Sequence, residues 1–114
     1  SSYPGFFYIV RSREIIEKGL QAEFNNGILR CKKILDNWNP EAADHRETYH
    51  TLYKTLTEFD KHIAFRYDGI TGSKYLQTIA GQLYDKVINI EDLKEFSQET
   101  QNVIIQISNI NTEL

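Results

Sequence analysis

The chain has 114 residues and a formal net charge of −3 at pH 7, which is the size of one ordinary domain. Hydrophobic residues make up 40% and charged residues 25%, and these proportions are typical of a folded globular protein rather than a disordered one. The longest unbroken apolar run, residues 6–10, is too short to cross a membrane as a helix. The single cysteine, Cys31, excludes an internal disulfide framework and a zinc site built from several cysteines.

The charge and the cysteine content also bear on partners and compartment. There are 13 Lys and Arg against 16 Asp and Glu, without a long basic cluster, so we expect no nucleic-acid partner. One cysteine fits a reducing cytoplasm, which we favour, and it fits equally an exported protein that needs no disulfide. Because methionine is absent, also at position 1, we expect a processing site or a chain boundary before Ser1, and removal of a signal peptide stays open.

Apolar side chains recur every three or four residues in the first third of the chain, which predicts an amphipathic helix over residues 12–37. The members of this stripe are Ile16, Leu20, Phe24, Ile28, Cys31, Leu35 and Trp38. The stripe stays in phase across residues 25–27, Asn-Asn-Gly, so we expect one continuous helix there, with a break into two short helices as the alternative. A start near residue 5 is also possible, so residues 1–11 form either an aromatic N-terminal arm or an extension of this helix.

Three further helices are predicted at residues 40–67, 72–88 and 90–111. The second opens on Asn39-Pro40-Glu41, which combines favoured N-cap and first-turn residues, and the fourth opens on an approximate capping box. The apolar stripe of the second helix consists of His45, Tyr49, Leu52, Tyr53, Leu56, Phe59, Ile63 and Tyr67. Short connections make neighbouring helices antiparallel. The predicted fold is therefore all-α: a single-domain, up-down-up-down four-helix bundle over residues 1–114 whose shared core includes Leu20, Leu56, Leu83 and Ile104.

The loop of residues 69–74 is a candidate anion-binding site. Gly72, Ser73 and Lys74 come at the predicted start of a helix, where free backbone N–H groups bind anions, and Arg66 with Lys74 would add positive charge. The spacing is not that of a P-loop. The alternative interpretation is purely structural, with the end of one helix followed by the N-cap of the next.

Histidine chemistry gives a second candidate. His50 is followed closely by Lys54, an order loosely similar to that of histidine-phosphotransfer domains, which are four-helix bundles. The lysine comes one position late, however, and Tyr53 and Thr55 occupy the space that a docking partner needs. Glu47 and His50 have the spacing of di-metal bundles, but the sequence lacks a second copy of that motif. We therefore expect no metal and no cofactor.

The distribution of apolar residues favours protein binding over catalysis. We find no nucleophile or acid–base pair in a catalytic pattern, so we expect no enzyme activity. Phe7 and Tyr8 point away from the stripe of the first helix, and Ile105 and Ile110 lie off or at the edge of that of the fourth. These side chains either form a joined apolar patch, which is typical of a binding surface, or cover each other. The sequence predicts a non-enzymatic interaction module (adaptor, inhibitor or immunity-type protein) that binds another protein or itself as a homodimer, with a small-ligand or phosphotransfer domain as the alternative.

Overall fold

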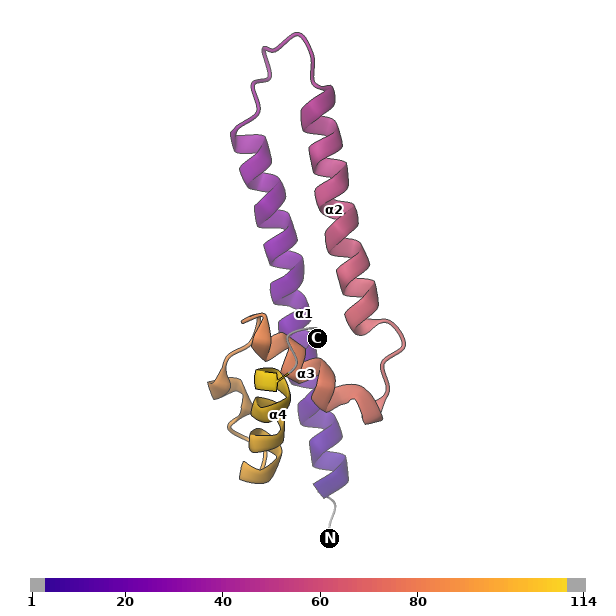
Figure 1. Ribbon diagram of the computed structural model, residues 1–114, viewed down its shortest axis with the longest axis vertical. Helices are drawn as coiled ribbons and strands as arrows, with labels where there is room; N and C mark the ends of the chain where they lie inside the picture. Colours follow the sequence, from indigo (N-terminus) through magenta and orange to yellow (C-terminus); the bar gives the residue numbers. More distant parts are fainter. Residues whose placement is uncertain (1–3, 111–114) are drawn as a thin grey trace. The chain divides into compact units, whose positions relative to one another are not determined.

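The computed structural model describes residues 4–110, which contain α-helices and short 3-10 helices and no strand. The α-helices are α1 (Pro4–Asp36), α2 (Arg46–Tyr67), α3 (Tyr75–Tyr84) and α4 (Gln98–Ile110), and the 3-10 helices are η1 (Gly72–Lys74) and η2 (Ile90–Leu93) (Figure 1). The prediction of an all-α protein with four helices is confirmed. Within the described part of the chain, no helix has the length and apolar character needed to cross a membrane.

The chain divides into two compact units. Unit 1 takes in the residues up to Ala22 and from Gly69 onward, and unit 2 is Glu23–Asp68. Unit 1 therefore combines the N-terminal part of α1 with α3 and α4, whereas unit 2 combines the C-terminal part of α1 with α2. That the chain forms one domain stays a prediction.

α1 is a single continuous helix of 33 residues that passes through Gly27 without a break, as the unbroken phase of its apolar stripe predicts. It begins at Pro4, so residues 4–11 extend the helix and do not form a separate arm. Proline suits this position because the first turn of a helix has no use for its missing N–H. Residues 1–3 and 111–114, which include the last residue of the predicted fourth helix, lie outside the described residues.

α2 begins at Arg46 and not at residue 40, so the predicted start is wrong. The Asn39 side chain accepts a hydrogen bond from the Glu41 N–H at 3.0 Å, and this bond belongs to a tight turn between the helices. A second turn follows, in which Asp44 Oδ1 accepts from the Arg46 N–H at 3.0 Å. Local side-chain bonds to the backbone thus compete successfully with helix formation over these residues.

α3 and α4 are shorter than predicted for separate reasons. α3 ends at Tyr84 and not at residue 88, because Lys86 has a φ of 63°, which an α-helix cannot contain. The capping box of Asn89 and Asp92 is present, but it caps the 3-10 helix η2 rather than α4. α4 starts only at Gln98. Ser97 caps its N-terminus, because Ser97 Oγ accepts a hydrogen bond from the Thr100 N–H at 3.1 Å.

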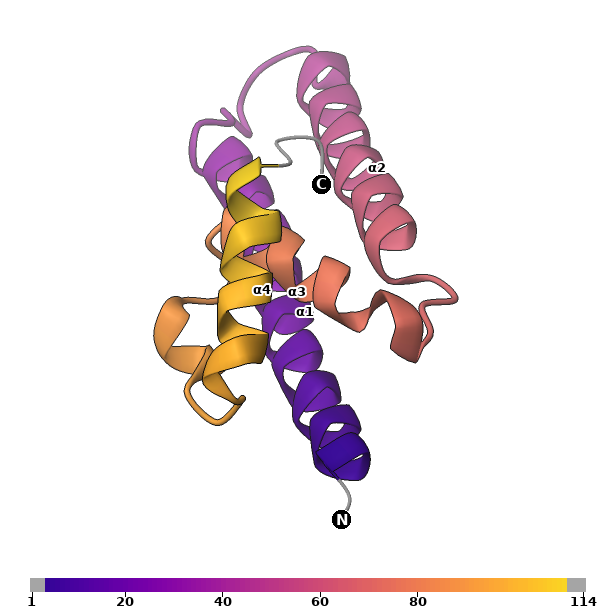
Figure 2. The same cartoon turned by 60° about the horizontal axis from the view of Figure 1, so that its bottom comes forward.

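Unit 1 contains the hydrophobic core. Its buried apolar side chains come from α1, α3, α4 and the segment between α3 and α4, and they are Ile15, Ile16, Tyr75, Ile79, Ala80, Ile88, Leu93, Phe96 and Ile104. Figure 2 shows α3 and α4 lying side by side.

Gln82 of α3 is fully buried, and its Nε2 donates to the Ile16 carbonyl oxygen at 3.0 Å. Gly19 makes this approach possible, since a Cβ there would lie 2.2 Å from Gln82 Nε2.

Candidate functional site

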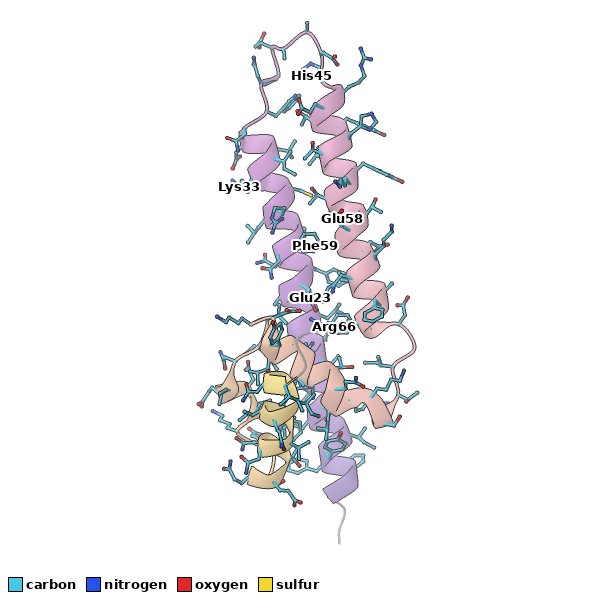
Figure 3. The ribbon with its side chains drawn as sticks, viewed as in Figure 1. Glu23, Lys33, His45, Glu58, Phe59 and Arg66 are labelled. Atoms are coloured by element: carbon cyan, nitrogen blue, oxygen red, sulfur yellow. The ribbon has the colours of Figure 1, made fainter. Side chains whose placement is uncertain are left out.

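Unit 2 is an antiparallel helical hairpin of α1 and α2 (Figure 3). Gly27 of α1 faces Phe59 of α2 so closely that a Cβ on the glycine would lie 3.3 Å from the ring. The guanidinium of Arg30 lies 5.8 Å from the centroid of the same ring, a cation–π contact. At the loop end of the hairpin, Trp38 Nε1 donates to His45 Nδ1 at 2.9 Å. Small and aromatic residues thus set the spacing of the two helices.

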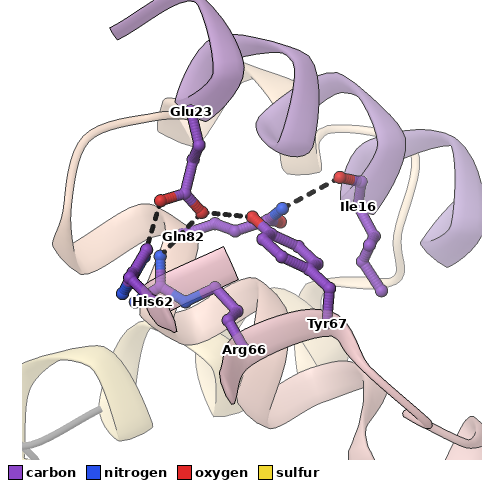
Figure 4. A network of polar contacts seen from close by, with 6 residues as sticks. All are labelled: Ile16, Glu23, His62, Arg66, Tyr67 and Gln82. Atoms are coloured by element: carbon purple, nitrogen blue, oxygen red, sulfur yellow. Dashed lines mark hydrogen bonds and ion pairs between the residues drawn. The ribbon is translucent and has the colours of Figure 1, made fainter. Parts of the chain in front are cut away.

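A buried polar cluster joins the two helices at the opposite end of the hairpin (Figure 4). Glu23 of α1 is only 5% exposed, and its carboxylate accepts from Arg66 Nη1 at 3.1 Å and from the Tyr67 hydroxyl. His62 Nε2 lies 2.6 Å from the other carboxylate oxygen. Because Arg66 is buried as well, the carboxylate and the guanidinium compensate each other's charge where water cannot. We refer to these four residues as the Glu23 cluster.

An open groove runs along one side of the hairpin. It has a volume of about 680 Å³ and is lined mainly by Phe24, Ile28, Tyr53, Leu56, Asp60 and Ile63. Several of its apolar side chains are largely accessible, with exposed fractions of 65% for Ile28, 66% for Tyr53 and 53% for Leu56. The rest of the lining includes Glu23, so the groove begins beside the Glu23 cluster. Its chemical character is apolar and aromatic, with Asp60 as an accessible acidic group.

The prediction that the apolar stripes of α1 and α2 lie in a shared core is wrong for most of their members. Among the described residues of unit 2, the exposed large apolar side chains are Phe24, Ile28, Leu29, Leu35, Trp38, Tyr49, Tyr53, Leu56 and Phe65. Of the four predicted core residues, Ile104 is fully buried, Leu20 and Leu83 are half-buried, and Leu56 is exposed. Two packed helices bury only the side chains that lie between them. Apolar side chains on the adjacent row of each helix therefore remain exposed to solvent.

The predicted anion-binding residues belong to different units. Arg66 lies in unit 2, where the Glu23 carboxylate binds it. Gly72, Ser73 and Lys74 lie in unit 1, where they form η1 and are exposed. The anion site stays a prediction, and Arg66 is engaged in a buried ion pair.

The predicted partner-binding residues of unit 1 differ in accessibility. Phe7 and Ile110 are 60% and 76% exposed. Tyr8 and Ile105 are half-buried, and the Tyr8 ring packs against Phe96 with the centroids 6.0 Å apart. Burial raises the pKa of the Tyr8 hydroxyl above its ordinary value. Tyr8 therefore contributes to the packing of unit 1, while Phe7 is open to solvent.

His50, the predicted phosphotransfer residue, is exposed on α2, and its ring centroid lies 5.5 Å from that of Tyr49. A phosphotransfer role stays a prediction. Across residues 4–110, no group of three or more His, Cys, Asp or Glu side chains comes close enough to hold a metal ion.

No protein-family model, curated protein or solved structure matches this chain. The fold and the groove alone therefore define its class, an all-helical protein with an apolar-faced helical hairpin. The groove residues Ile28, Tyr53 and Leu56 were assigned to the core by sequence reasoning. The sequence carries no signal that separates them from core residues, because the number and position of the neighbouring helices decide which row of a helix is covered.

Proposed function

We propose that this chain is a non-enzymatic protein-interaction module, of the adaptor, inhibitor or immunity type, that binds its partner through the groove of the α1–α2 hairpin. The observation that carries the proposal is the accessible apolar lining of that groove, above all Ile28, Tyr53 and Leu56. Monomeric soluble proteins rarely leave a contiguous patch of such side chains open to water, and larger patches mark binding surfaces.

The composition of the groove supports a protein partner. Aromatic residues are enriched at the centres of protein interfaces, and the groove offers Phe24 and Tyr53. Asp60 gives it a polar group that can fix the orientation of a partner. Both walls are helices, so the side chains are held by rigid elements rather than loops. A preformed site of this kind binds with little ordering cost.

A site-specific crosslinking experiment tests the proposal. A photoreactive phenylalanine analogue replaces Tyr53 in the groove, and a matched control carries the analogue at Phe65, which is 83% exposed on α2 but outside the groove lining. On irradiation in an extract of the source cells, the Tyr53 probe should form a discrete protein adduct that the Phe65 probe does not. Adding Ile28→Glu to the Tyr53 probe should abolish this adduct. Equal adducts at both positions, or an adduct indifferent to Ile28→Glu, would refute binding through the groove.

A further inference from the structure

We infer that the groove takes a second copy of this chain, so that two α1–α2 hairpins pack face to face as a four-helix bundle. The inference rests on the proposed function and names its partner. Three features of unit 2 support a second copy as the partner: the spacing of the open apolar rows, the area that they leave uncovered and the balance of charge.

The spacing of the open rows matches that of helices that pack in bundles. On α1, Phe24, Ile28, Cys31 and Leu35 follow one another at steps of four, three and four residues. On α2 the steps are four, three, four and three, along the row Tyr49, Tyr53, Leu56, Asp60 and Ile63. Alternation of three and four keeps a row on one face of a helix and lets it interdigitate with a like row. The one charged member of these rows, Asp60, is exposed in the single copy.

The neighbouring rows are already used within the hairpin. Glu23 and Gly27 of α1 face His62 and Phe59 of α2. Each helix thus has one row for the other helix and one row on its outward side. The outward rows line the groove over part of their length and continue beyond it with the exposed side chains of Leu35 and Tyr49. This is the arrangement of a helix in a four-helix bundle, which contacts two neighbours. One hairpin supplies two of the four helices, and a second copy supplies the other two with matching spacing.

The uncovered area is what a stable dimer needs. Six apolar side chains of these rows are between 43% and 67% exposed: Phe24, Ile28, Leu35, Tyr49, Tyr53 and Leu56. Fully open, side chains of this size present about 200 Å² each, so one copy leaves roughly 600–700 Å² uncovered. If pairing covered all of this area, two copies would together bury about 1,300 Å², at the lower end of the range of about 1,200–2,000 Å² found in stable interfaces.

The charge of unit 2 permits self-association. Residues 23–68 carry seven Lys or Arg and eight Asp or Glu, a net charge of −1. Two such hairpins therefore do not repel each other strongly. If the partner were recognised by its opposite charge, we would expect unit 2 to carry a large net charge of one sign. The Glu23 carboxylate at the end of the groove is compensated by Arg66 and so does not oppose burial.

The oligomeric state of the purified full chain tests the inference. Light scattering after size exclusion, together with sedimentation velocity, should show a concentration-dependent dimer of the 13.3 kDa chain. Ile28→Glu should raise the dissociation constant by about 100-fold, because the apolar contact is lost in both copies. Phe65→Glu, the matched control, should dimerise like the wild type. Circular dichroism checks that each variant keeps its helix content, and Tyr53→Lys repeats the test at a second open position.

The outcomes separate the partner from the function. A chain that remains monomeric at every concentration, or a dimer that Ile28→Glu and Tyr53→Lys both leave intact, overturns pairing through this groove. If the monomeric chain still gives the groove-specific crosslink to a different protein, the second copy is wrong as partner and the proposed function stands. If it is monomeric and gives no such crosslink, both proposals fail.

Discussion

The Glu23 cluster should dominate the stability of the hairpin, and Glu23→Gln is the change that tests this. The substitution keeps the size of the side chain and removes its charge. Glu23 and Arg66 are 5% and 7% exposed, so solvent cannot replace the lost interaction. A hydrogen bond to a charged group is worth about 1.5–3 kcal/mol, and removal of one member of a buried ion pair costs about 3–5 kcal/mol. Because glutamine can still accept hydrogen bonds, we expect a loss of about 2–3 kcal/mol.

The assay is urea unfolding followed by circular dichroism at neutral pH. The matched control is Glu58→Gln, the same substitution at an exposed position of α2, for which we expect a change within about 0.5 kcal/mol. The double variant Glu23→Leu, Arg66→Met should recover only part of the lost stability: apolar pairs often replace buried ion pairs without loss, but the Tyr67 hydroxyl and His62 still lose the Glu23 carboxylate as their partner. A Glu23→Gln protein as stable as the Glu58→Gln protein would refute the argument that this cluster holds the two helices together.

Two further predictions follow from contacts in unit 1. Gly19→Ala should lower the free energy of unfolding by about 1–3 kcal/mol in urea titrations, because the new methyl group meets the buried Gln82 side chain at 2.2 Å. Gly27→Ala in unit 2 has the same gain in helix propensity, and its methyl group meets the Phe59 ring at 3.3 Å, so the two effects should nearly cancel. Burial acts to raise the pKa of Asp92, but the Asn89 N–H and the nearby lysines outweigh it, so the pKa lies below its ordinary value. The ionised carboxylate thus stabilises the fold above about pH 4, and this contribution is lost as the pH falls through the lowered pKa. Stability titrations should show the wild type losing more stability on acidification than Asp92→Asn, and parallel curves would contradict this.

The helices themselves could be predicted from the sequence because apolar periodicity is a strong signal over long segments. α1 is the clearest case, since its stripe stays in phase through Gly27 and the helix is continuous there. Helix ends depend on a few local bonds and are less predictable. Asn39 and Pro40 are residue types that favour the start of a helix. In the structure, however, the Asn39 side chain accepts a hydrogen bond within a turn. Lys86 has a positive φ. Lysine has no preference for this conformation, so the residue type does not predict that the helix ends here.

The groove could not be predicted from the same periodicity. Neighbouring residues of a helix differ by about 100° in direction, so two adjacent rows fit within the arc of one broad stripe. Gly27 comes directly before the stripe member Ile28, but Gly27 faces Phe59 while Ile28 is 65% exposed. Only the number and position of neighbouring helices decide which row is covered. In the predicted bundle, each apolar row of a helix was expected to contact another helix. The groove residues were therefore assigned to the core.

The Glu23 cluster explains how the hairpin can leave the groove side chains exposed and still keep its geometry. A pair of helices held only by apolar contacts can slide, because such contacts are non-directional. The bonds of Glu23 to Arg66 and Tyr67 are directional and fix the register of α1 against α2. The hairpin can thus hold its geometry without burying Ile28 or Tyr53. Loosening the Glu23 cluster should therefore weaken binding through the groove even though the groove side chains themselves are unchanged, because a sliding hairpin no longer presents its two rows at a constant spacing.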